Sequence, residues 1–328
     1  MRPPTWAMSR LLWILLALGA ARAAVSQPLP EIHYSFRLFL PVQGDFFRKP
    51  LAVTADWEVG EIFVSDSLTN RILIFDRDGL FRFELSGGYF FRSPLDLAVD
   101  KEGYMFLLAY FRGRRAVSLL DFDGKFIEEI QLSGTTEAER EPRLKSLALS
   151  PDGNRLYFLD DANQRMWITD RKGTVLSSQD LANDLTEQEA LEQVLGRVDV
   201  YHDTVLVAVP TAGQVYLYDL DGTWRTGVGI KGTAPCQTPF PIAAALDLSG
   251  NVIVADLKMS QLMIWDPATN NCLGAHGALG NAPGAFIRPV DLTLDRSGRI
   301  FVTQQFEGRV QAFDLVEPTP PGNADGAP

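Results

Sequence analysis

Residues 47–79 read FRKPLAVTADWEVGEIFVSDSLTNRILIFDRDG. This stretch holds three short apolar runs that end at Asp56, Asp66 and Asp76, with Gly, Asn and other polar residues between them. Short runs rich in β-branched residues, bounded by turn residues, are typical of strands. The Asp-Gly pair at 78–79 favours a tight hairpin, because Gly accepts the positive φ that such turns need. The stretch therefore predicts a meander of antiparallel strands.

The same pattern recurs along the chain. Close copies of its first part are FRSPLDLAVD at 91–100 and FIRPVDLTLD at 286–295. The Asp that closes the third apolar run recurs at steps of 45, 49, 49, 47 and 48 residues, at positions 76, 121, 170, 219, 266 and 314. Such a period indicates a repeat architecture, and no unit carries the helical pattern that parallel α/β sheets require. Six such units predict an all-β, six-bladed β-propeller with four-stranded antiparallel blades.

The two ends of the chain are expected to close the ring. The sixth unit ends at Asp314, after its third strand, and the Pro-rich tail at 316–328 is predicted to be disordered. Residues 33–40, HYSFRLFL, precede the first unit and have the composition of a strand. We expect this N-terminal strand to complete the last blade, because the pairing removes an open sheet edge. The propeller is thus predicted over residues 31–315.

Residues 1–23 have the layout of a secretory signal peptide. Arg2 and Arg10 precede the apolar run LLWILLAL at 11–18, and Ala21-Arg22-Ala23 fits the cleavage pattern. The apolar run is short for a membrane span, and a signal-anchored form is the alternative. We expect a secreted or periplasmic protein, whose formal net charge would fall from −11 to −14 when three Arg and no acid are removed.

Composition excludes several classes of protein. The 328 residues are 46% hydrophobic and 22% charged, which fits neither a disordered nor a fibrous chain. The 41 acids against 30 bases argue against a nucleic-acid partner. The two cysteines, Cys236 and Cys272, flank the fifth unit, and an oxidising compartment permits a disulfide between them. The predicted blade layout places them toward opposite faces, so the pairing stays open.

The complete unit is Phe-x-x-Pro, an apolar strand ending in Asp, Gly-x-Ile-x-Val-x-Asp, Asn-Arg-Ile and Phe-Asp-x-Asp-Gly. It resembles the NHL repeat, and the resemblance covers residues 45–315. The resemblance implies a six-bladed propeller. It does not imply one activity, because related propellers serve as enzymes, sensors and adhesive modules, and function must be argued from a site.

One candidate site is the central channel. The position two residues after each Phe-x-x-Pro proline is expected to face it, and Asp96 and Asp291 could bind Ca²⁺ there through oxygen. This is the basis of the alternative reading, a metal-dependent hydrolase or lyase. Ca²⁺ takes about six to eight oxygens, so we favour satisfied polar residues and no cofactor. The expected channel positions are Ala52, Asp96, Ser146, Arg197, Ala243 and Asp291.

The resemblance also points to enzymes in related propellers. Gluconolactonase-like propellers use a Glu, an Asn and an Asp in such places, and this set cannot be assembled here. The amidating-lyase relatives use several His around zinc, whereas this chain has only His33, His202 and His276, in different parts of the predicted ring.

The second candidate site is a basic loop face. The Phe-x-x-Pro loops and the loops between second and third strands emerge on the same face of a four-stranded meander. They carry Arg48, Lys49, Arg92, Arg288, Arg71, Arg165 and Arg309. Arg pairs with carboxylates and phosphates, so this face could bind a protein or an anionic ligand; local pairing, as of Arg71 with Asp66 or Arg165 with Asp160, is the alternative. We expect an exported, monomeric ring that acts as a non-catalytic binding scaffold.

Overall fold

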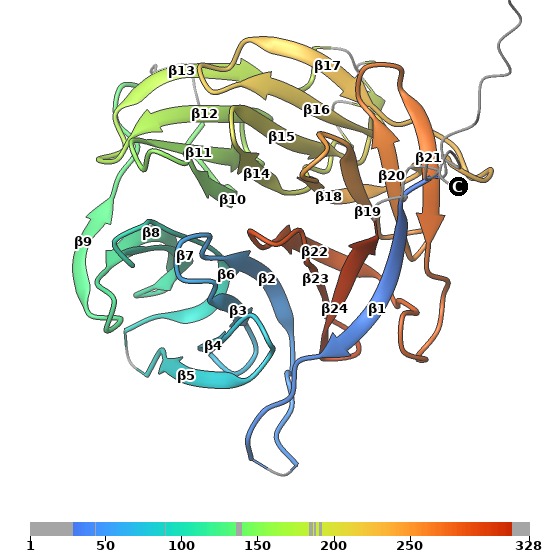
Figure 1. Ribbon diagram of the computed structural model, residues 1–328. Helices are drawn as coiled ribbons and strands as arrows, with labels where there is room; N and C mark the ends of the chain where they lie inside the picture. Colours follow the sequence, from blue (N-terminus) through green and yellow to red (C-terminus); the bar gives the residue numbers. More distant parts are fainter. Residues whose placement is uncertain are drawn as a thin grey trace, which may run out of the picture. The chain divides into compact units, whose positions relative to one another are not determined.

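A computed structural model describes residues 29–316, except 43, 89, 136–139, 184–185, 187 and 190–191. Its strands form six four-stranded antiparallel sheets that are arranged around a centre (Figure 1). The described residues from 30 to 316 belong to one compact unit. The predicted six-bladed β-propeller is thereby confirmed. The predicted signal peptide at 1–23 and residues 317–328 of the predicted tail lie outside the described residues, whereas Val316, predicted to belong to the disordered tail, is the last residue of β24.

Each blade is a meander whose strands follow one another from the centre outward. The innermost strands are β2 Pro50–Ala55, β6 Arg92–Val99, β10 Leu144–Leu149, β14 Val198–Tyr201, β18 Pro241–Leu246 and β22 Pro289–Leu294. The second strands are β3 Ile62–Asp66, β7 Met105–Phe111, β11 Arg155–Asp160, β15 Thr204–Val209, β19 Val252–Asp256 and β23 Ile300–Gln304. The third strands are β4 Arg71–Phe75, β8 Arg114–Leu120, β12 Arg165–Asp170, β16 Gln214–Asp219, β20 Gln261–Asp266 and β24 Arg309–Val316. The outermost strands are β5 Phe81–Ser86, β9 Phe126–Ile130, β13 Val175–Asp180, β17 Trp224–Val228, β21 Asn271–His276 and β1 Glu31–Arg37.

The N-terminal strand closes the ring as predicted. β1 pairs antiparallel with β24, from Glu31 opposite Val316 to Arg37 opposite Gln311. The last blade therefore combines β22, β23 and β24 with a strand from the other end of the chain. This pairing gives the sixth sheet its fourth strand and covers the edge that β24 would otherwise expose.

The hydrophobic core lies between neighbouring blades. One cluster joins Val64 and Phe75 of the first blade to Phe301 and Ala312 of the last, all fully buried. The Phe of the repeat motif is buried in the same way at positions 47, 91 and 286. Apolar area removed from water stabilises the fold by about 25 cal/mol per Å², and here it joins neighbouring sheets of the ring.

In four of the six blades, a polar side chain at the end of the second strand holds the loop that leads into the inner strand. In four blades its oxygen accepts a hydrogen bond from a backbone N–H in the Phe-x-x-Pro region. The pairs are Asp66 with the Lys49 N–H at 2.7 Å, Asp160 with Arg143 at 2.9 Å, Asp256 with Phe240 at 2.8 Å and Gln304 with Ile287 at 2.8 Å. Asp66 of the repeat thus fixes the loop that carries Arg48 and Lys49, and Gln304 at the same position of the last blade fixes the loop that carries Arg288.

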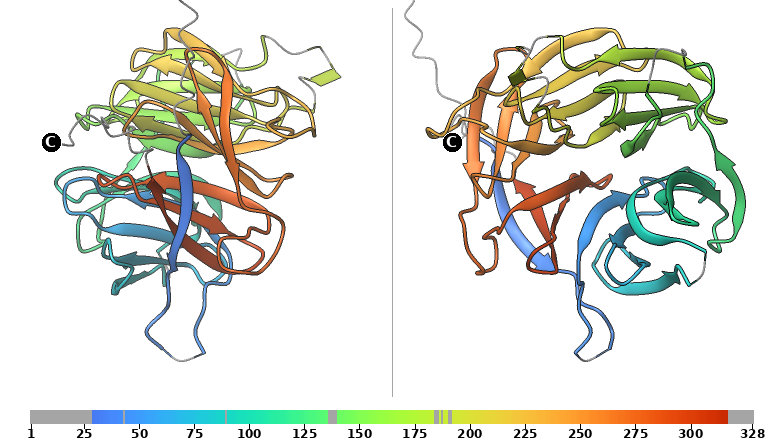
Figure 2. Two further views of the ribbon diagram at one scale, coloured as in Figure 1. Left: turned by 45° about the vertical axis from the view of Figure 1, so that its right-hand side comes forward. Right: turned by 180° about the vertical axis from the view of Figure 1, so that it is seen from behind.

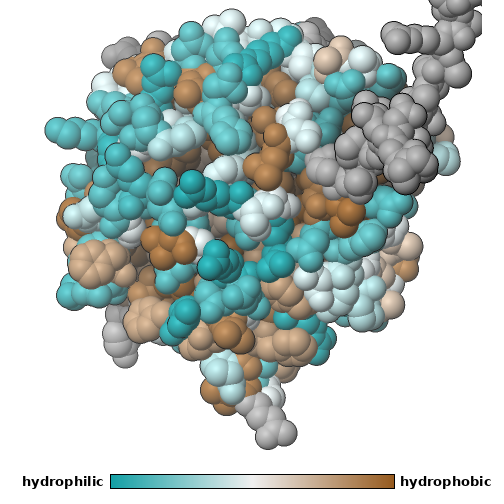
Figure 3. Space-filling view, viewed as in Figure 1, coloured by the Kyte–Doolittle hydropathy of each residue, from teal (hydrophilic) through white to brown (hydrophobic). Residues whose placement is uncertain are grey.

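The loop between β1 and β2 projects beyond the blades in each view of the ring (Figures 1 and 2). It carries the exposed side chains of Phe39, Val42 and Phe46. Figure 3 shows hydrophobic side chains at the lower edge of this face, where the loop between β1 and β2 projects. Among the described residues, no helix is long and apolar enough to span a bilayer.

Candidate functional site

The six predicted channel positions are structurally equivalent. In five blades the residue directly follows a bulge in the pairing of the first two strands, as between Pro50 and Ala52 or between Pro289 and Asp291. In the fourth blade Arg197 stands just before β14, and its carbonyl accepts the N–H of Ala208 in β15. The predicted assignment of Arg197 to the channel is therefore confirmed.

Arg197 lies across the centre of the ring. Its Nη1 is 3.1 Å from Asp96 Oδ2, and its Nε is 3.9 Å from Asp291 Oδ1. The guanidinium also donates to the carbonyl of Leu95, at 3.1 Å, and to that of Leu51. One side chain of the fourth blade thus connects it to the first, second and sixth blades.

Asp96 and Asp291 also join neighbouring blades. Asp291 Oδ2 accepts the N–H of Val53 at 3.0 Å, and Asp96 Oδ2 accepts the N–H of Leu147 at 3.0 Å and the hydroxyl of Ser146 at 2.6 Å. The inner strand of a blade has an unpaired edge, and buried N–H groups on it need an acceptor. These two carboxylates provide that acceptor to the next blade around the ring.

Burial and charge oppose each other at the channel centre. Burial raises the pKa of Asp291, the Arg197 charge lowers it and the Asp96 charge raises it, and the net shift is upward. Burial lowers the pKa of Arg197, but the charges of Asp96 and Asp291 outweigh this and leave that pKa raised. Arg197 therefore stays cationic and compensates the two buried carboxylates.

This arrangement bears on the metal alternative. A cation bound by Asp96 and Asp291 would have to occupy the space between them, where the Arg197 guanidinium stands. Within the part of the chain that the structure describes, no group of three or more His, Cys, Asp or Glu side chains could hold a metal ion. The residues at this position do not fit a Ca²⁺ or Zn²⁺ centre, and we derive no chemistry through one.

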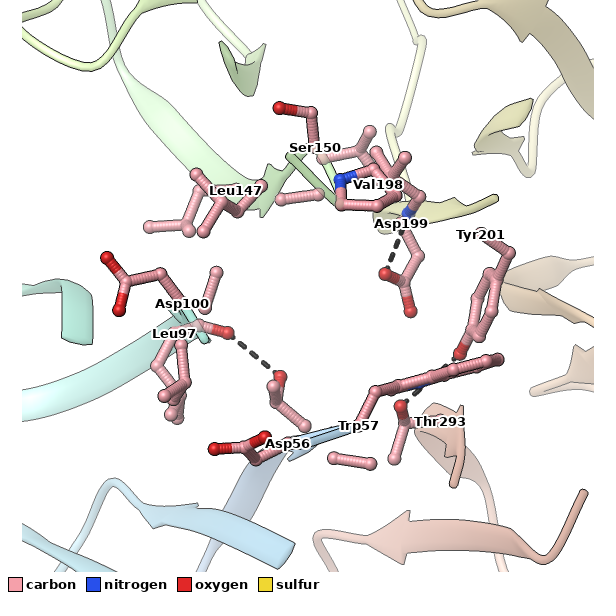
Figure 4. A pocket seen from close by; sticks show the side chains of 18 of the residues that line it. Asp56, Trp57, Leu97, Asp100, Leu147, Ser150, Val198, Asp199, Tyr201 and Thr293 are labelled. Carbon is pink, nitrogen blue, oxygen red and sulfur yellow. Dashed lines mark hydrogen bonds between the residues drawn. The ribbon is translucent and has the colours of Figure 1, made fainter. Parts of the chain in front are cut away.

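A cavity of about 240 Å³ lies beside Arg197, toward the carboxyl ends of the inner strands (Figure 4). Side chains in strands point to alternate sides, so the residues two positions beyond the channel centre form the next layer. Those that line the cavity are Thr54, Ala98, Ala148, Asp199 and Thr293. Asp199 is the one ionisable residue of a layer that otherwise has small side chains.

Asp199 is held by few contacts. Its Oδ1 accepts the N–H of Val200 at 2.8 Å, and its carboxylate points into the cavity (Figure 4). No ion pair among the described residues includes it. The side chain of Tyr201 also hydrogen-bonds to Asp199. Burial raises the pKa of Asp199 to about 8, the hydrogen bonds from the Val200 N–H and the Tyr201 hydroxyl oppose the shift, and the charges of Asp291 and Asp96 add to it.

Aromatic side chains close one side of the cavity. The Trp57 ring, from the turn after β2, lies 5.4 Å from the His202 ring and 6.0 Å from the Tyr201 ring, measured between centroids. Tyr201 reaches past the alanines of β18, its hydroxyl 3.3 Å from that of Thr293 and accepting the Leu294 N–H at 3.1 Å. Trp57 thus contacts the turn of the blade opposite its own.

Reasoning from the sequence missed Asp199, Tyr201 and Trp57 as parts of one site. A sequence signal did exist for Asp199, because it lies two residues after the channel position Arg197. No pattern in the sequence pointed to Trp57, whose partners lie about 145 residues away in the opposite blade.

The predicted basic residues separate into two groups. Arg48, Lys49, Arg92 and Arg288 are exposed at the amino ends of inner strands, opposite to the end that carries the cavity. No ion pair within the described ranges involves any of these four. They form what we call the basic loop surface, defined by Arg48, Lys49, Arg92 and Arg288.

The other three arginines are engaged within the ring. Arg71 is 8% exposed and pairs with Asp45 at 2.8 Å, Glu84 at 3.2 Å and Asp66 at 3.5 Å. Arg165 donates to the Ser178 hydroxyl, and Arg309 donates to the carbonyls of residues 280, 281 and 285. The alternative of local pairing therefore describes Arg71, Arg165 and Arg309 better than the partner-binding prediction does.

The structure joins Cys236 and Cys272 in a disulfide, with their Cα atoms 5.8 Å apart. The predicted layout placed them toward opposite faces, and this placement was wrong. The loop after β17 crosses to the neighbouring blade, where the Gly229 N–H donates to the side chain of Asn270 at 2.9 Å. Cys236, farther along this loop, thereby reaches the start of β21.

Comparison with known proteins supports the fold of the chain but assigns it to no family. No protein-family model matches the chain, and no curated protein matches it. Among solved structures, the chain is similar to a structural genomics protein of unknown function from Bacteroides thetaiotaomicron. The two are 15% identical with a TM-score of 0.65, over 88% of this chain and 76% of that one. At this identity the likeness concerns the fold alone, and the similarity to the NHL repeat stays a resemblance of sequence.

Proposed function

We propose that the protein is an exported, non-catalytic binding scaffold that contacts an acidic protein or another anionic ligand through the basic loop surface. The observation that carries this proposal is the exposure of Arg48, Lys49, Arg92 and Arg288 without ion-pair partners in the described structure. They belong to the sixth, first and second blades, whose inner strands are neighbours. The four cations therefore share one continuous part of the ring.

Aromatic rings support two of these arginines. The Arg48 guanidinium lies 3.9 Å from the centroid of Phe46, and that of Arg288 lies 5.4 Å from the centroid of Phe306. These rings are 49% and 60% exposed. Arg and aromatic residues are enriched in protein interfaces, and a stacked guanidinium keeps its planar donor edge available to carboxylates or phosphates.

The backbone beneath this surface is fixed. Asp66 accepts the N–H groups of both Arg48 and Lys49, and the Ser260 hydroxyl accepts the N–H of Arg288 at 3.3 Å. A rigid loop loses less conformational entropy when it binds. Because Arg197 already neutralises Asp96 and Asp291, we prefer the scaffold over the hydrolase or lyase alternative.

The test is a quantitative pull-down from the exported fraction of cells that make the protein. Replacing Arg48, Arg92 and Arg288 together by Glu should abolish recovery of the partner, because three attractive charges become repulsive. The matched control replaces Arg77, Lys172 and Arg296 by Glu; these exposed residues lie in turns at the other ends of the strands.

The control changes the net charge by the same amount and should leave recovery unchanged. Equal recovery by the wild type and the Arg48, Arg92 and Arg288 variant would refute the proposal. Loss of recovery in both variants would attribute binding to net charge and would refute it too.

A further inference from the structure

We propose that the cavity beside Arg197 is a second binding site, and that it takes a small organic cation: an amine whose ammonium group pairs with Asp199 and whose apolar body lies against Trp57. This site lies at the carboxyl ends of the inner strands and is independent of the basic loop surface at their amino ends.

Asp199 has no cation as an ion-pair partner among the described residues of the cavity. Arg197 lines the same cavity, but its guanidinium is already shared between Asp96, Asp291 and two backbone carbonyls. At the mouth, Lys101 pairs with Glu102 at 3.7 Å. Asp199 is thus a carboxyl group in a cavity whose cations all have other partners.

Two other acids of the cavity, Asp56 and Asp100, are already held by the fold. Asp56 accepts the N–H groups of Glu58 and Val59 in its own turn. Asp100 accepts the Tyr104 N–H and pairs with Arg171 at 2.6 Å. Both carboxylates point away from the cavity centre in Figure 4, whereas that of Asp199 points toward it. Asp199 is therefore the carboxyl group of the inner layer that points into the cavity without an ion-pair partner among the described residues.

The raised pKa of Asp199 agrees with a carboxyl group that has no cation beside it. Burial and two neighbouring carboxylates hold its pKa at about 8, so the empty site keeps this group protonated at neutral pH. An ammonium group within hydrogen-bonding distance would reverse that effect, because an opposite charge favours the ionised carboxylate. Binding of an amine at pH 7 should therefore release a proton.

The walls fit an apolar body of limited size. Ala98, Ala148 and Leu97 form one side of the cavity, and Trp57 closes another. An indole face attracts cations and packs well against apolar groups. The small side chains around Asp199 create the free volume, and the cavity of about 240 Å³ suits a compact ligand with one ring.

Isothermal titration calorimetry with three probes of the same shape tests the proposal. We expect 2-phenylethylamine to bind at least about tenfold more tightly than 2-phenylethanol or phenylacetate, since a charge-assisted hydrogen bond exists only for the amine. Equal affinity for the amine and the alcohol would overturn the proposal, as would preference for the anion.

Two substitutions test which residues bind the ammonium group and the apolar body of the amine. Asp199→Asn keeps the shape of the side chain and should lower amine affinity at least about tenfold, whereas Trp57→Leu should weaken both amine and alcohol. The matched control is Asp78→Asn, an exposed acid in the turn after β4, and it should bind as the wild type does. Wild-type affinity in Asp199→Asn would overturn the assignment; near-ultraviolet circular dichroism verifies that each variant is folded.

The number of protons released when the amine binds provides a second readout. Apolar packing of the ligand against the cavity walls would not change this number. Titrations at pH 7 in buffers of different ionisation enthalpy should show protons leaving on amine binding to the wild type and none in Asp199→Asn. The other titratable and charged groups that line the cavity are Asp96, Asp291, Arg197, Asp56, Glu58, Asp100, Lys101, Tyr201 and His202. If Asp199→Asn released as many protons as the wild type, one of these groups would be the source and the ion pair would be refuted.

Discussion

At one equivalent position in each blade, after the bulge in five inner strands and just before β14 in the fourth blade, the chain carries Ala, Asp, Ser, Arg, Ala and Asp. These side chains determine how the blades meet. Asp96, Asp291 and Ser146 accept N–H groups from the next blade, and Arg197 binds both carboxylates. A buried charge network of this kind is costly to break, because the remaining group loses its compensation.

We predict that Arg197→Ala destabilises the ring by about 3–5 kcal/mol, since it leaves two buried carboxylates and two carbonyls without their donor. Thermal unfolding followed by circular dichroism measures this. Arg82→Ala is the control, because Arg82 is 61% exposed in a surface pair with Asp76 and should cost at most about 1 kcal/mol.

The effect of Arg197→Ala should depend on pH. Burial already raises the pKa of Asp291 above its ordinary 3.8, and without Arg197 it should rise further. When the pKa of a carboxyl group is higher in the native state than in the unfolded state, the group stabilises the native state at a pH below its unfolded-state pKa. That contribution is lost as the pH rises through the native-state pKa. The variant should therefore lose more stability at pH 8 than at pH 4, and adding Asp291→Asn should remove part of the difference. A loss that did not change with pH would contradict this account.

At the scale of the element, β1 differs from the other outer strands because its partner lies at the far end of the chain. Its side chains also enter the core: Ile32 is buried, and Tyr34 and Phe36 make edge-to-face contacts with Phe313 and Phe301. The strand therefore provides backbone pairing and apolar contacts to the last blade at once.

We predict that deleting residues 31–41 unfolds the ring cooperatively, because it removes the pairing that joins the chain ends and exposes the edge of β24. The control is a deletion of residues 318–328, which should melt as the full chain does. Thermal melting of both proteins, with size-exclusion chromatography to detect aggregation, makes the comparison. A 31–41 deletion with the melting temperature of the parent would show that closure by β1 is dispensable.

At the scale of the whole molecule, the two ends of the inner strands differ in what they offer. The amino ends carry the basic loop surface, and the carboxyl ends carry the cavity with Asp199. A ring of rigid blades can present both without either affecting the other, because binding residues stand on loops fixed by a packed scaffold. The disulfide between Cys236 and Cys272 agrees with the proposed export, since such bonds persist in oxidising compartments.

We predict that the exported protein begins at residue 24, with a formal net charge of −14. Mass spectrometry of the intact protein from the exported fraction determines its N-terminus. Recovery of Met1 in the membrane fraction would instead support the signal-anchored form.

Much of the fold could be predicted because its information is local. Apolar runs closed by Asp, with Asp-Gly turns between them, specify strands and hairpins within a few residues of each other. The regular step between the Asp residues from 76 to 314 then gives the number of blades. The channel positions followed too, since Arg197 and Asp291 occupy the same place in their repeats as Asp96 does.

The contacts between blades could not be predicted in this way. Arg71 occupies a regular position of the repeat, yet it is buried and forms ion pairs with three acids from different segments. Arg92 also occupies a regular position, and its side chain is exposed. Trp57 meets His202 only because the ring places their turns face to face, and Cys236 meets Cys272 only because a loop crosses between two blades.

The sequence by itself determined the strands, their turns, the six blades and the closing strand, because propensity and periodicity act over short distances along the chain. The tertiary structure alone decided which arginines stay free, which cysteines bond and that Asp199 faces a cavity under Trp57. Those features depend on the curvature of the ring and the packing between blades, which bring together residues that no local pattern relates.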